Sequence, residues 1–173
     1  MLHTKLIKNI EIISVSGDLK RNPNILGLSS DSRKIKPGFL FIAQKGSAYD
    51  GHKFTFEAIN AGARAILVTK NTKKLKNASV PILISNTPRK CSALLAAKFH
   101  SFQPNNIVAV TGTNGKTSVI GFLSQIWSKL GRKSATLGTL GFTLNALNIH
   151  TPLTTPDPIF IHEKLAKLKK EKL

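Results

Sequence analysis

The stretch Ile107-Val108-Ala109-Val110-Thr111-Gly112-Thr113-Asn114-Gly115-Lys116-Thr117-Ser118 decides the fold, because it combines an apolar run, a glycine-framed turn and a helix start. We predict a buried strand over residues 107–110, a phosphate-binding loop, and a helix over residues 117–130. Gly112 and Gly115 lack Cβ atoms, so the backbone N–H groups of the turn can approach a phosphate closely. This order of elements predicts an α/β protein that binds ATP.

The loop contains the candidate ligands for the ATP phosphates, which are Gly112, Thr113, Asn114, Gly115, Lys116, Thr117 and Ser118. Lys116 supplies positive charge and is the predicted catalytic residue. Thr117 offers a hydroxyl to Mg²⁺, and the helix N-terminus adds N–H donors and its dipole. The loop is a shorter variant of the common P-loop, since Val110 stands where that pattern has glycine. An ordinary strand-to-helix turn with a solvated lysine is the alternative interpretation.

Toward the C-terminus the pattern indicates further elements. Apolar residues recur at helical spacing in the predicted helix, so we expect Trp127 in the core and Gly131 at the C-terminal cap. Residues 134–142 are rich in strand-forming residues and glycine. Asp157 is the predicted N-cap of a last helix, with Pro158 in its first position.

Upstream, four apolar runs predict strands over residues 25–28, 39–43, 65–68 and 80–84. Helices are predicted over residues 54–61 and 89–102. We place a domain boundary in residues 104–106. The expected architecture is a small N-terminal α/β domain over residues 1–103. It is followed by the start of a P-loop (Rossmann-like) ATP-binding domain over residues 104–173, which we expect to be truncated.

Composition argues against two classes of partner. The 173-residue chain has a net charge of +18, and a basic surface attracts polyanions. Its lysines are nevertheless dispersed and only 6% of its residues are aromatic, so we predict no nucleic-acid partner. No apolar run approaches the ~20 residues of a membrane span. The first 13 residues lack the apolar core of a signal peptide, and the lone Cys91 suits a reducing compartment, so we expect a cytoplasmic location.

Acidic residues are distributed unevenly. No Asp or Glu occurs between Glu57 and Asp157. A P-loop enzyme normally needs a carboxylate near the phosphates to hold Mg²⁺ or to order the nucleophile. Either Asp157 or Glu163 performs this task, or the chemistry relies on sequence beyond residue 173, and we favour the second.

Several motifs occur in order along the chain: Ser30-Asp31-Ser32-Arg33, Pro37-Gly38-Phe39-Leu40-Phe41-Ile42-Ala43, Asp50-Gly51-His52-Lys53-Phe54 and the loop over residues 111–117. Together they resemble the Mur ligase family. The first of them is shared by the members that add the third amino acid and by those that add the terminal dipeptide. Leu137-Gly138-Thr139, followed by Thr154-Thr155-Pro156, is similar to the third-amino-acid enzymes.

The resemblance implies a three-domain ligase of peptidoglycan precursor synthesis, of which this chain covers the first domain and the opening of the second. The activity it implies is ATP-dependent ligation of a diamino acid to UDP-N-acetylmuramoyl-L-alanyl-D-glutamate through an acyl phosphate. The diamino-acid site lies outside the chain, which we expect to bind without turnover. The implied contacts with the UDP-sugar substrate are Ser30, Ser32, Ser47, Ala48, Tyr49, Thr154 and Thr155.

The sequence leaves several alternatives open. Asp31 and Arg33 form either a local ion pair or a ligand contact. Asp50 and His52 fit turn chemistry better than acid–base catalysis. Thr154 and Thr155 also precede a helix cap. For the whole chain, the alternatives are a terminal-dipeptide ligase, a non-catalytic nucleotide-binding module and a basic P-loop protein acting on nucleic acid or a small substrate.

Overall fold

The computed structural model describes residues 3–18, 22–46, 49–69, 75, 78–144, 147–150 and 155–171. The chain forms two compact units, Met1–Phe99 and His100–Leu173, which are called the first and the second unit and are described separately. Both units combine helices and strands, so the predicted α/β class is confirmed.

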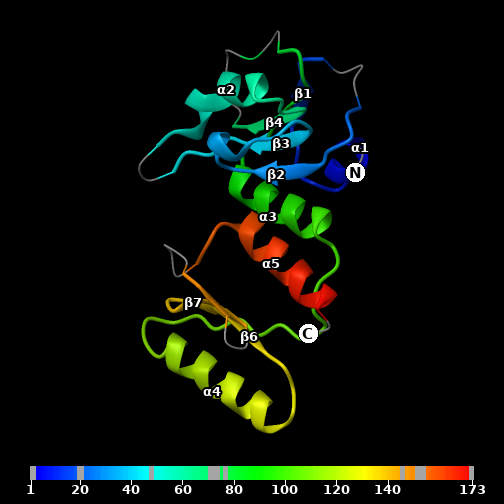
Figure 1. The fold of residues 1–173 in the computed structure, drawn as a ribbon. Coiled ribbons are helices and arrows are strands. Elements are labelled where there is room, and N and C mark those ends of the chain that lie inside the picture. The colour runs from blue at the N-terminus through cyan, green and yellow to red at the C-terminus, as the bar shows by residue number, and fades with distance from the viewer. Residues whose placement is uncertain are drawn as a thin grey trace. The chain divides into compact units, whose positions relative to one another are not determined.

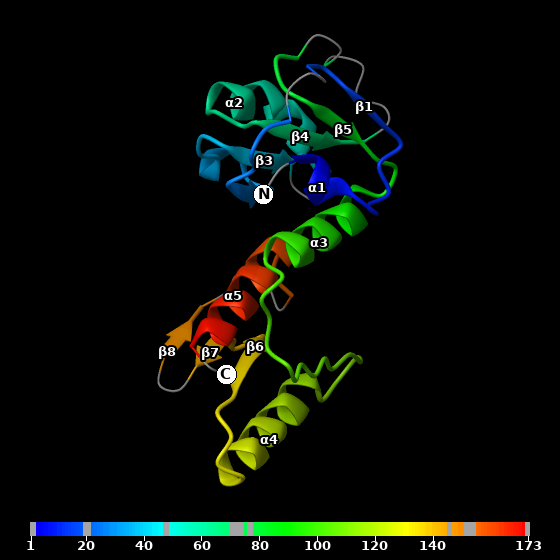
Figure 2. The ribbon, with the colours of Figure 1, turned by 90° about the vertical axis from the view of Figure 1, so that its right-hand side faces the viewer.

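The first unit is built on a five-stranded sheet in the order β1-β5-β4-β3-β2. Its strands are β1 (Ser14–Ser16), β2 (Gly27–Ser29), β3 (Phe39–Ile42), β4 (Ala65–Val68) and β5 (Ile82–Ile84). Figure 2 shows β1, β5, β4 and β3, and Figure 1 shows β2 beside β3. Strands β2 to β5 are parallel, whereas β1 pairs antiparallel with β5. The four predicted strands correspond to β2 through β5, and β1 was not predicted because it is only three residues long and has no fully buried residue.

The helices of this unit are α1 (His3–Ile7), the 3-10 turns η1 (Ser32–Lys34) and η2 (Gly51–Phe54), α2 (Thr55–Asn60) and α3 (Pro88–Phe99). Figures 1 and 2 show α2 on one side of the sheet and α3 on the other. Helix α3 ends earlier than the predicted residue 102. Pro104 has no N–H to continue the helical ladder, and the carbonyl of His100 accepts a 3.1 Å bond from Gln103 Nε2 instead.

The core of the first unit contains side chains from both faces of its central strands. Phe41 and Ile66 belong to a buried cluster that includes Ala58 of α2. Leu40 and Leu67 are equally buried, and the alternation of a strand directs them to the opposite face. A strand covered on both faces needs a near-continuous apolar sequence, which explains the apolar runs of β3 and β4.

The second unit contains a three-stranded antiparallel sheet in the order β6-β7-β8, together with two helices. Its elements are α4 (Lys116–Lys129), β6 (Ala135–Gly138), β7 (Gly141–Leu144), β8 (Leu147–Ile149) and α5 (Pro158–Lys170). Both predicted caps are confirmed. Gly131 N–H bonds the carbonyl of Ser128 at 2.9 Å, and Asp157 accepts the N–H of Ile159 at 2.7 Å. Each helix that the structure describes is too short or too polar to cross a membrane.

Two expectations for the second unit are wrong. Residues 107–110 form no strand, and Ile107 and Val108 are each 54% exposed. A parallel strand is held by hydrogen bonds to its neighbours, and no strand of the described chain pairs with this run. Trp127 is half-buried rather than in a core, since α4 packs chiefly on β6 and has no buried residue.

Candidate functional site

The loop before α4 has glycines in the conformations that a tight phosphate-binding turn requires. Gly112 has a φ of 148° and Gly115 a φ of 78°, both in the region that favours glycine. Gly115 is the N-cap of α4, and its carbonyl accepts the N–H of Val119 at 2.9 Å. The N–H groups of residues 116–118 therefore stand ahead of the helical ladder, at the positive end of the helix.

The side chain of Lys116 folds back over this loop. Its Nζ donates to the carbonyl oxygens of Gly112 at 2.5 Å and of Thr113 at 3.2 Å. These bonds hold the ammonium beside the loop backbone, where a phosphate oxygen is a stronger partner than a neutral carbonyl. The other candidates in the loop are exposed: Gly112, Thr113, Asn114, Gly115, Thr117 and Ser118. The loop is therefore accessible and fits a phosphate group.

Thr117 is the candidate ligand for Mg²⁺. It is exposed and lies in the first turn of α4, so its hydroxyl fits one ligand position. Within the described ranges no group of three or more His, Cys, Asp or Glu side chains is placed to hold a metal ion. Mg²⁺ usually takes its remaining ligands from substrate phosphates and water, which is compatible with a single hydroxyl here.

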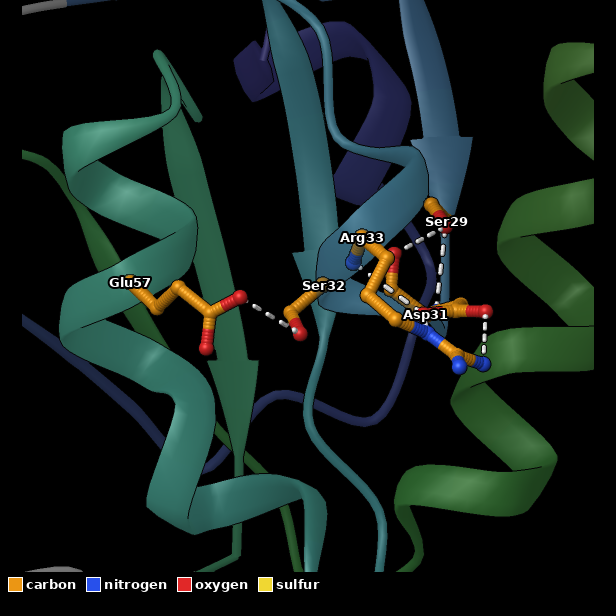
Figure 3. Close-up of polar contacts among 5 residues, drawn as sticks. All are labelled: Ser29, Asp31, Ser32, Arg33 and Glu57. Atoms are coloured by element: carbon orange, nitrogen blue, oxygen red, sulfur yellow. Dashed lines mark hydrogen bonds and ion pairs between the residues drawn. The ribbon is translucent and has the colours of Figure 1, made fainter.

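A polar network follows the end of β2 in the first unit (Figure 3). Ser29 Oγ accepts the N–H of Asp31 at 3.0 Å and donates to the carbonyl of Asp31 at 2.9 Å. Asp31 caps η1 and accepts Nε and Nη2 of Arg33, both at 2.9 Å. The hydrogen bond from Arg33 is the main cause that lowers the pKa of Asp31. The structure thus has the local ion pair that the sequence left open for Asp31 and Arg33.

Ser32 lies on the other side of this network. The residue is buried at the start of η1, and its hydroxyl points toward Glu57 of α2, with 3.5 Å between Ser32 Oγ and Glu57 Oε1 (Figure 3). Ser30 is half-buried at the bend between β2 and η1. Both candidate serines therefore follow the carboxyl end of β2.

The loop after β3 carries the next candidates. Tyr49 is 77% exposed, whereas Ser47 and Ala48 lie outside the described residues. Gly46 N–H bonds the carbonyl of Tyr49 at 2.9 Å. Because β2 and β3 are neighbouring parallel strands, their carboxyl ends meet at one edge of the sheet. The fold thus brings Ser30, Ser32 and Tyr49 to the same edge.

A groove of about 400 Å³ lies along this edge, at the carboxyl ends of β3, β4 and β5. Gln44 and Lys45 follow β3, Thr69 follows β4, and residues 86–90 lead from β5 into α3. Ligands of open parallel sheets bind outside the carboxyl ends of the strands. Lys45 and Arg89 give the groove a positive charge, so it fits an anionic group.

The remaining candidates belong to the second unit. Thr154 lies outside the described residues, and Thr155 is exposed ahead of the Asp157 cap. Sequence inspection missed Ser29, Glu57 and Thr69. Ser29 adjoins the quoted Ser30, and Glu57 is the last acidic residue before the long gap, so each had a weak signal. Thr69 had none, because its partner lies 17 positions away in the chain.

Two family descriptions match the chain in succession. The Mur ligase family, catalytic domain, matches residues 24–100. The Mur ligase middle domain matches residues 110–173. Together the two matches cover most of both units.

Individual proteins that are similar to this chain are also ligases by name. UDP-N-acetylmuramoyl-L-alanyl-D-glutamate–2,6-diaminopimelate ligase of Mesorhizobium japonicum is 40% identical over 157 residues, which are 91% of this chain and 32% of that protein. The enzyme of the same name from Brucella melitensis is 45% identical over 147 residues, covering 85% of this chain and 30% of that protein. The chain thus spans about a third of the length of the relatives it matches.

Solved structures are similar as well. A structure of UDP-N-acetylmuramoyl-L-alanyl-D-glutamate–2,6-diaminopimelate ligase matches with a TM-score of 0.75 and 25% identity, over 99% of this chain and 34% of that one. MurF from Acinetobacter baumannii matches with a TM-score of 0.54 and 25% identity, over 87% of this chain and 30% of that one.

Proposed function

This chain belongs to the Mur ligase family, and from that membership we propose that it supplies substrate binding to an ATP-dependent ligase of peptidoglycan precursor synthesis. In the proposed reaction a diamino acid is joined to UDP-N-acetylmuramoyl-L-alanyl-D-glutamate. The observation that carries the proposal is the loop over residues 112–118, in which two positive-φ glycines, Lys116 and a helix N-terminus converge. The names of the relatives support diaminopimelate as the amino acid.

The proposed chemistry has two steps. A substrate carboxylate attacks the γ-phosphorus of ATP, and ADP leaves as an acyl phosphate forms. The incoming amine then attacks the acyl carbon, and the C–O bond to phosphate breaks to give the amide. Lys116 is assigned to the β- and γ-phosphates, where its charge stabilises the transferring group. Thr117 is assigned to Mg²⁺, which when bound neutralises phosphate charge.

We assign the UDP end of the substrate to the first unit. Ser30, Ser32 and Tyr49 lie at the edge of the sheet where ligands of parallel sheets bind, and the groove at that edge is basic. A diphosphate carries charge that the Lys45 ammonium complements. Ser47 and Ala48 are assigned to the same site, and Thr154 and Thr155 to the muramoyl-peptide part.

We propose that this chain binds both substrates without turning them over. The chain spans about a third of the length of the relatives that it matches, and the diamino-acid site is assigned to none of its residues. ATP as a substrate and the free thiol of Cys91 suit the cytoplasm, which we propose as its location. A terminal-dipeptide ligase receives less support, since MurF matches with the lower TM-score.

Calorimetric titration of the chain tests these assignments. We expect saturable binding of UDP-N-acetylmuramoyl-L-alanyl-D-glutamate and, independently, of ATP with Mg²⁺. Lys116→Ala is expected to weaken ATP binding by about 10- to 100-fold, as for loss of a charged hydrogen-bond donor, without affecting the UDP-sugar. Ser32→Ala is expected to weaken binding of the UDP-sugar without affecting ATP binding. Lys129→Ala, at the far end of α4, is the matched charge control.

A titration with duplex DNA distinguishes the ligase proposal from the alternative of a basic P-loop protein that acts on nucleic acid. Under the ligase proposal the +18 chain binds DNA weakly and only at low salt, because the contacts are to phosphates alone. Tight DNA binding without any binding of the UDP-sugar or ATP would overturn the proposal.

A further inference from the structure

His52 bridges two parts of the first unit that are distant in sequence. Its Nδ1 lies 2.6 Å from Oδ1 of Asp50, which also accepts the His52 N–H at 3.0 Å. On the other side of the ring, Nε2 lies 3.3 Å from the N–H nitrogen of Thr69 and 3.2 Å from Thr69 Oγ1. Thr69 directly follows β4, so the ring links the turn after β3 to the end of the next strand.

The bonding pattern assigns the tautomer of the ring. The backbone N–H of Thr69 only donates, so Nε2 must accept and the ring proton resides on Nδ1, facing the Asp50 carboxylate. The ring is largely buried, with a side-chain exposure of 15%. A buried ring with a fixed partner on each nitrogen has one orientation. Asp50 and Lys45 lie close to the ring, Lys53 belongs to the same 3-10 turn, and Arg89 Nη2 donates to the carbonyl of Lys45 at 3.4 Å.

The same turn closes the base of the loop that carries Tyr49. Lys45 and Asp50 pair across the base as an isolated antiparallel bridge. Gly51 N–H bonds the carbonyl of Gln44 at 2.9 Å, and a Cβ on Gly51 would meet that oxygen at 2.7 Å. The loop therefore leaves β3 and returns beside it, and His52 stands at the point of return.

We propose that His52 is a positioning residue for the UDP-sugar: by joining Asp50 to Thr69, it fixes the loop that carries Tyr49 against the binding edge of the sheet. This inference rests on the proposed function, because it assigns the loop to the UDP end of the substrate. His52 itself acts through the loop and touches no substrate. Removing the bridge frees the loop, so substrate binding has to order it again.

The chain offers an internal reporter for this loop. Tyr49 is its only tyrosine and Trp127 its only tryptophan. In a chain labelled with ¹³C in both ring types, one signal therefore reports on the loop and the other on the second unit. The titrant is UDP, because it contains the nucleotide end assigned to this site without the sugar and peptide.

Four proteins make the comparison. His52→Ala removes both ring bonds. His52→Gln places an acceptor where Nε2 stands and can retain the bond from Thr69, whereas His52→Asn reproduces only the Nδ1 position and its bond to Asp50. His150→Ala, at an exposed histidine of the second unit, is the matched control.

We expect His52→Ala to move the Tyr49 signal, leave the Trp127 signal in place and weaken UDP binding by about tenfold, the effect of one or two lost hydrogen bonds. His52→Gln is expected to recover more affinity than His52→Asn, which a role confined to the Asp50 turn would not produce. The His52 variants are expected to bind ATP with Mg²⁺ as the parent protein does. His150→Ala is expected to leave the Tyr49 signal and the UDP affinity unchanged. If His52→Ala unfolds, the Gln and Asn variants carry the same comparison.

Two results overturn the inference, and they differ from each other. Equal UDP affinity in the parent protein and in the His52 variants would leave the proposed function standing and remove the positioning role. Failure of UDP to bind even the parent protein would overturn the proposed site and, with it, the inference.

Discussion

Two short apolar runs of this chain have similar sequences and opposite structures. Phe39–Ile42 forms β3 between two parallel neighbours, and Leu40 in it is fully buried. Residues 107–110 also precede a polar loop, yet they form no strand and Ile107 is 54% exposed. An apolar run thus becomes a buried parallel strand only where neighbouring strands supply its hydrogen bonds and other elements cover both of its faces.

The loop that follows residues 107–110 has a defined structure although the run itself forms no strand. The glycine turn over residues 112–115 and α4 form although residues 107–110 make no strand, because their signals are local. Gly115 is the N-cap of the helix, and Gly131 follows its last turn with the Gly131 N–H bonded to the carbonyl of Ser128. Caps depend on partners within a few positions, whereas a parallel sheet depends on distant ones.

The largest expected difference between the units is in the unfolding free energy lost when a phenylalanine of each unit is replaced by alanine. Phe41→Ala empties a fully buried site in the first unit and is expected to cost about 3 to 5 kcal/mol of unfolding free energy. Phe122→Ala, on the 63% exposed side chain in α4, is expected to change it by less than about 0.5 kcal/mol. Urea unfolding followed at the Tyr49 and Trp127 ring signals measures each unit separately. A large cost at Phe122 would mean that the exposed face of α4 is covered in solution.

Glycine substitutions are expected to differ in sign between the units. Gly62 has a φ of 97°, and a Cβ there would lie 2.9 Å from Pro37 Cα, so Gly62→Ala should destabilise the first unit by about 2 to 3 kcal/mol. Gly121 lies inside α4, and a Cβ added to it would have nothing within 4 Å. Gly121→Ala should therefore stabilise that helix by about 0.5 to 1 kcal/mol.

Helix content from circular dichroism, together with the same urea transitions, measures both glycine effects. Destabilisation by Gly121→Ala would show that a neighbour approaches this face of α4 in solution. No effect of Gly62→Ala would mean that the turn beside Pro37 relaxes without strain.

The sequence predicted the features that depend on neighbouring residues. Four strands of the first unit, the glycine turn before α4 and the Asp157 cap followed from apolar runs and turn residues, and the structure confirms them. The wrong expectations, the strand over residues 107–110 and the burial of Trp127, assumed a covering layer that a sequence pattern cannot supply. An apolar residue is buried only if another element packs on it.

The candidate site also has one part that the sequence predicted and another part that it did not. The loop over residues 112–118 was predictable because its chemistry is contiguous. The contacts of Ser32 with Glu57 and of His52 with Thr69 join residues 25 and 17 positions apart. Their partners are brought together by the order of the strands, which no local motif encodes.

The smallest expected effect is a difference in pH dependence between the units. Burial lowers the pKa of both His100 and His162 in the second unit. In the unfolded chain these rings regain the ordinary value of ~6.5, so the unfolded state takes up protons first as the pH falls. The second unit is therefore expected to lose stability from about pH 7 down to the lowered pKa values of the folded rings. In the first unit, hydrogen bonds from Arg33 and His52 lower the pKa of Asp31 and Asp50, respectively.

A carboxyl group with a lowered pKa affects stability in a lower pH range. Its contribution to stability is complete above the ordinary carboxyl pKa and is lost only as the pH falls through the lowered one. At pH 5 the urea midpoint followed at Trp127 should thus be lower than at pH 7.5, while the carboxylates of the first unit still contribute fully. Combined substitution of His100→Gln and His162→Gln should reduce this dependence, whereas His150→Gln, at an exposed ring, should leave it unchanged. A Trp127 midpoint that stays constant from pH 7.5 to 5 would show that the two rings are as solvated in the folded second unit as in the unfolded chain.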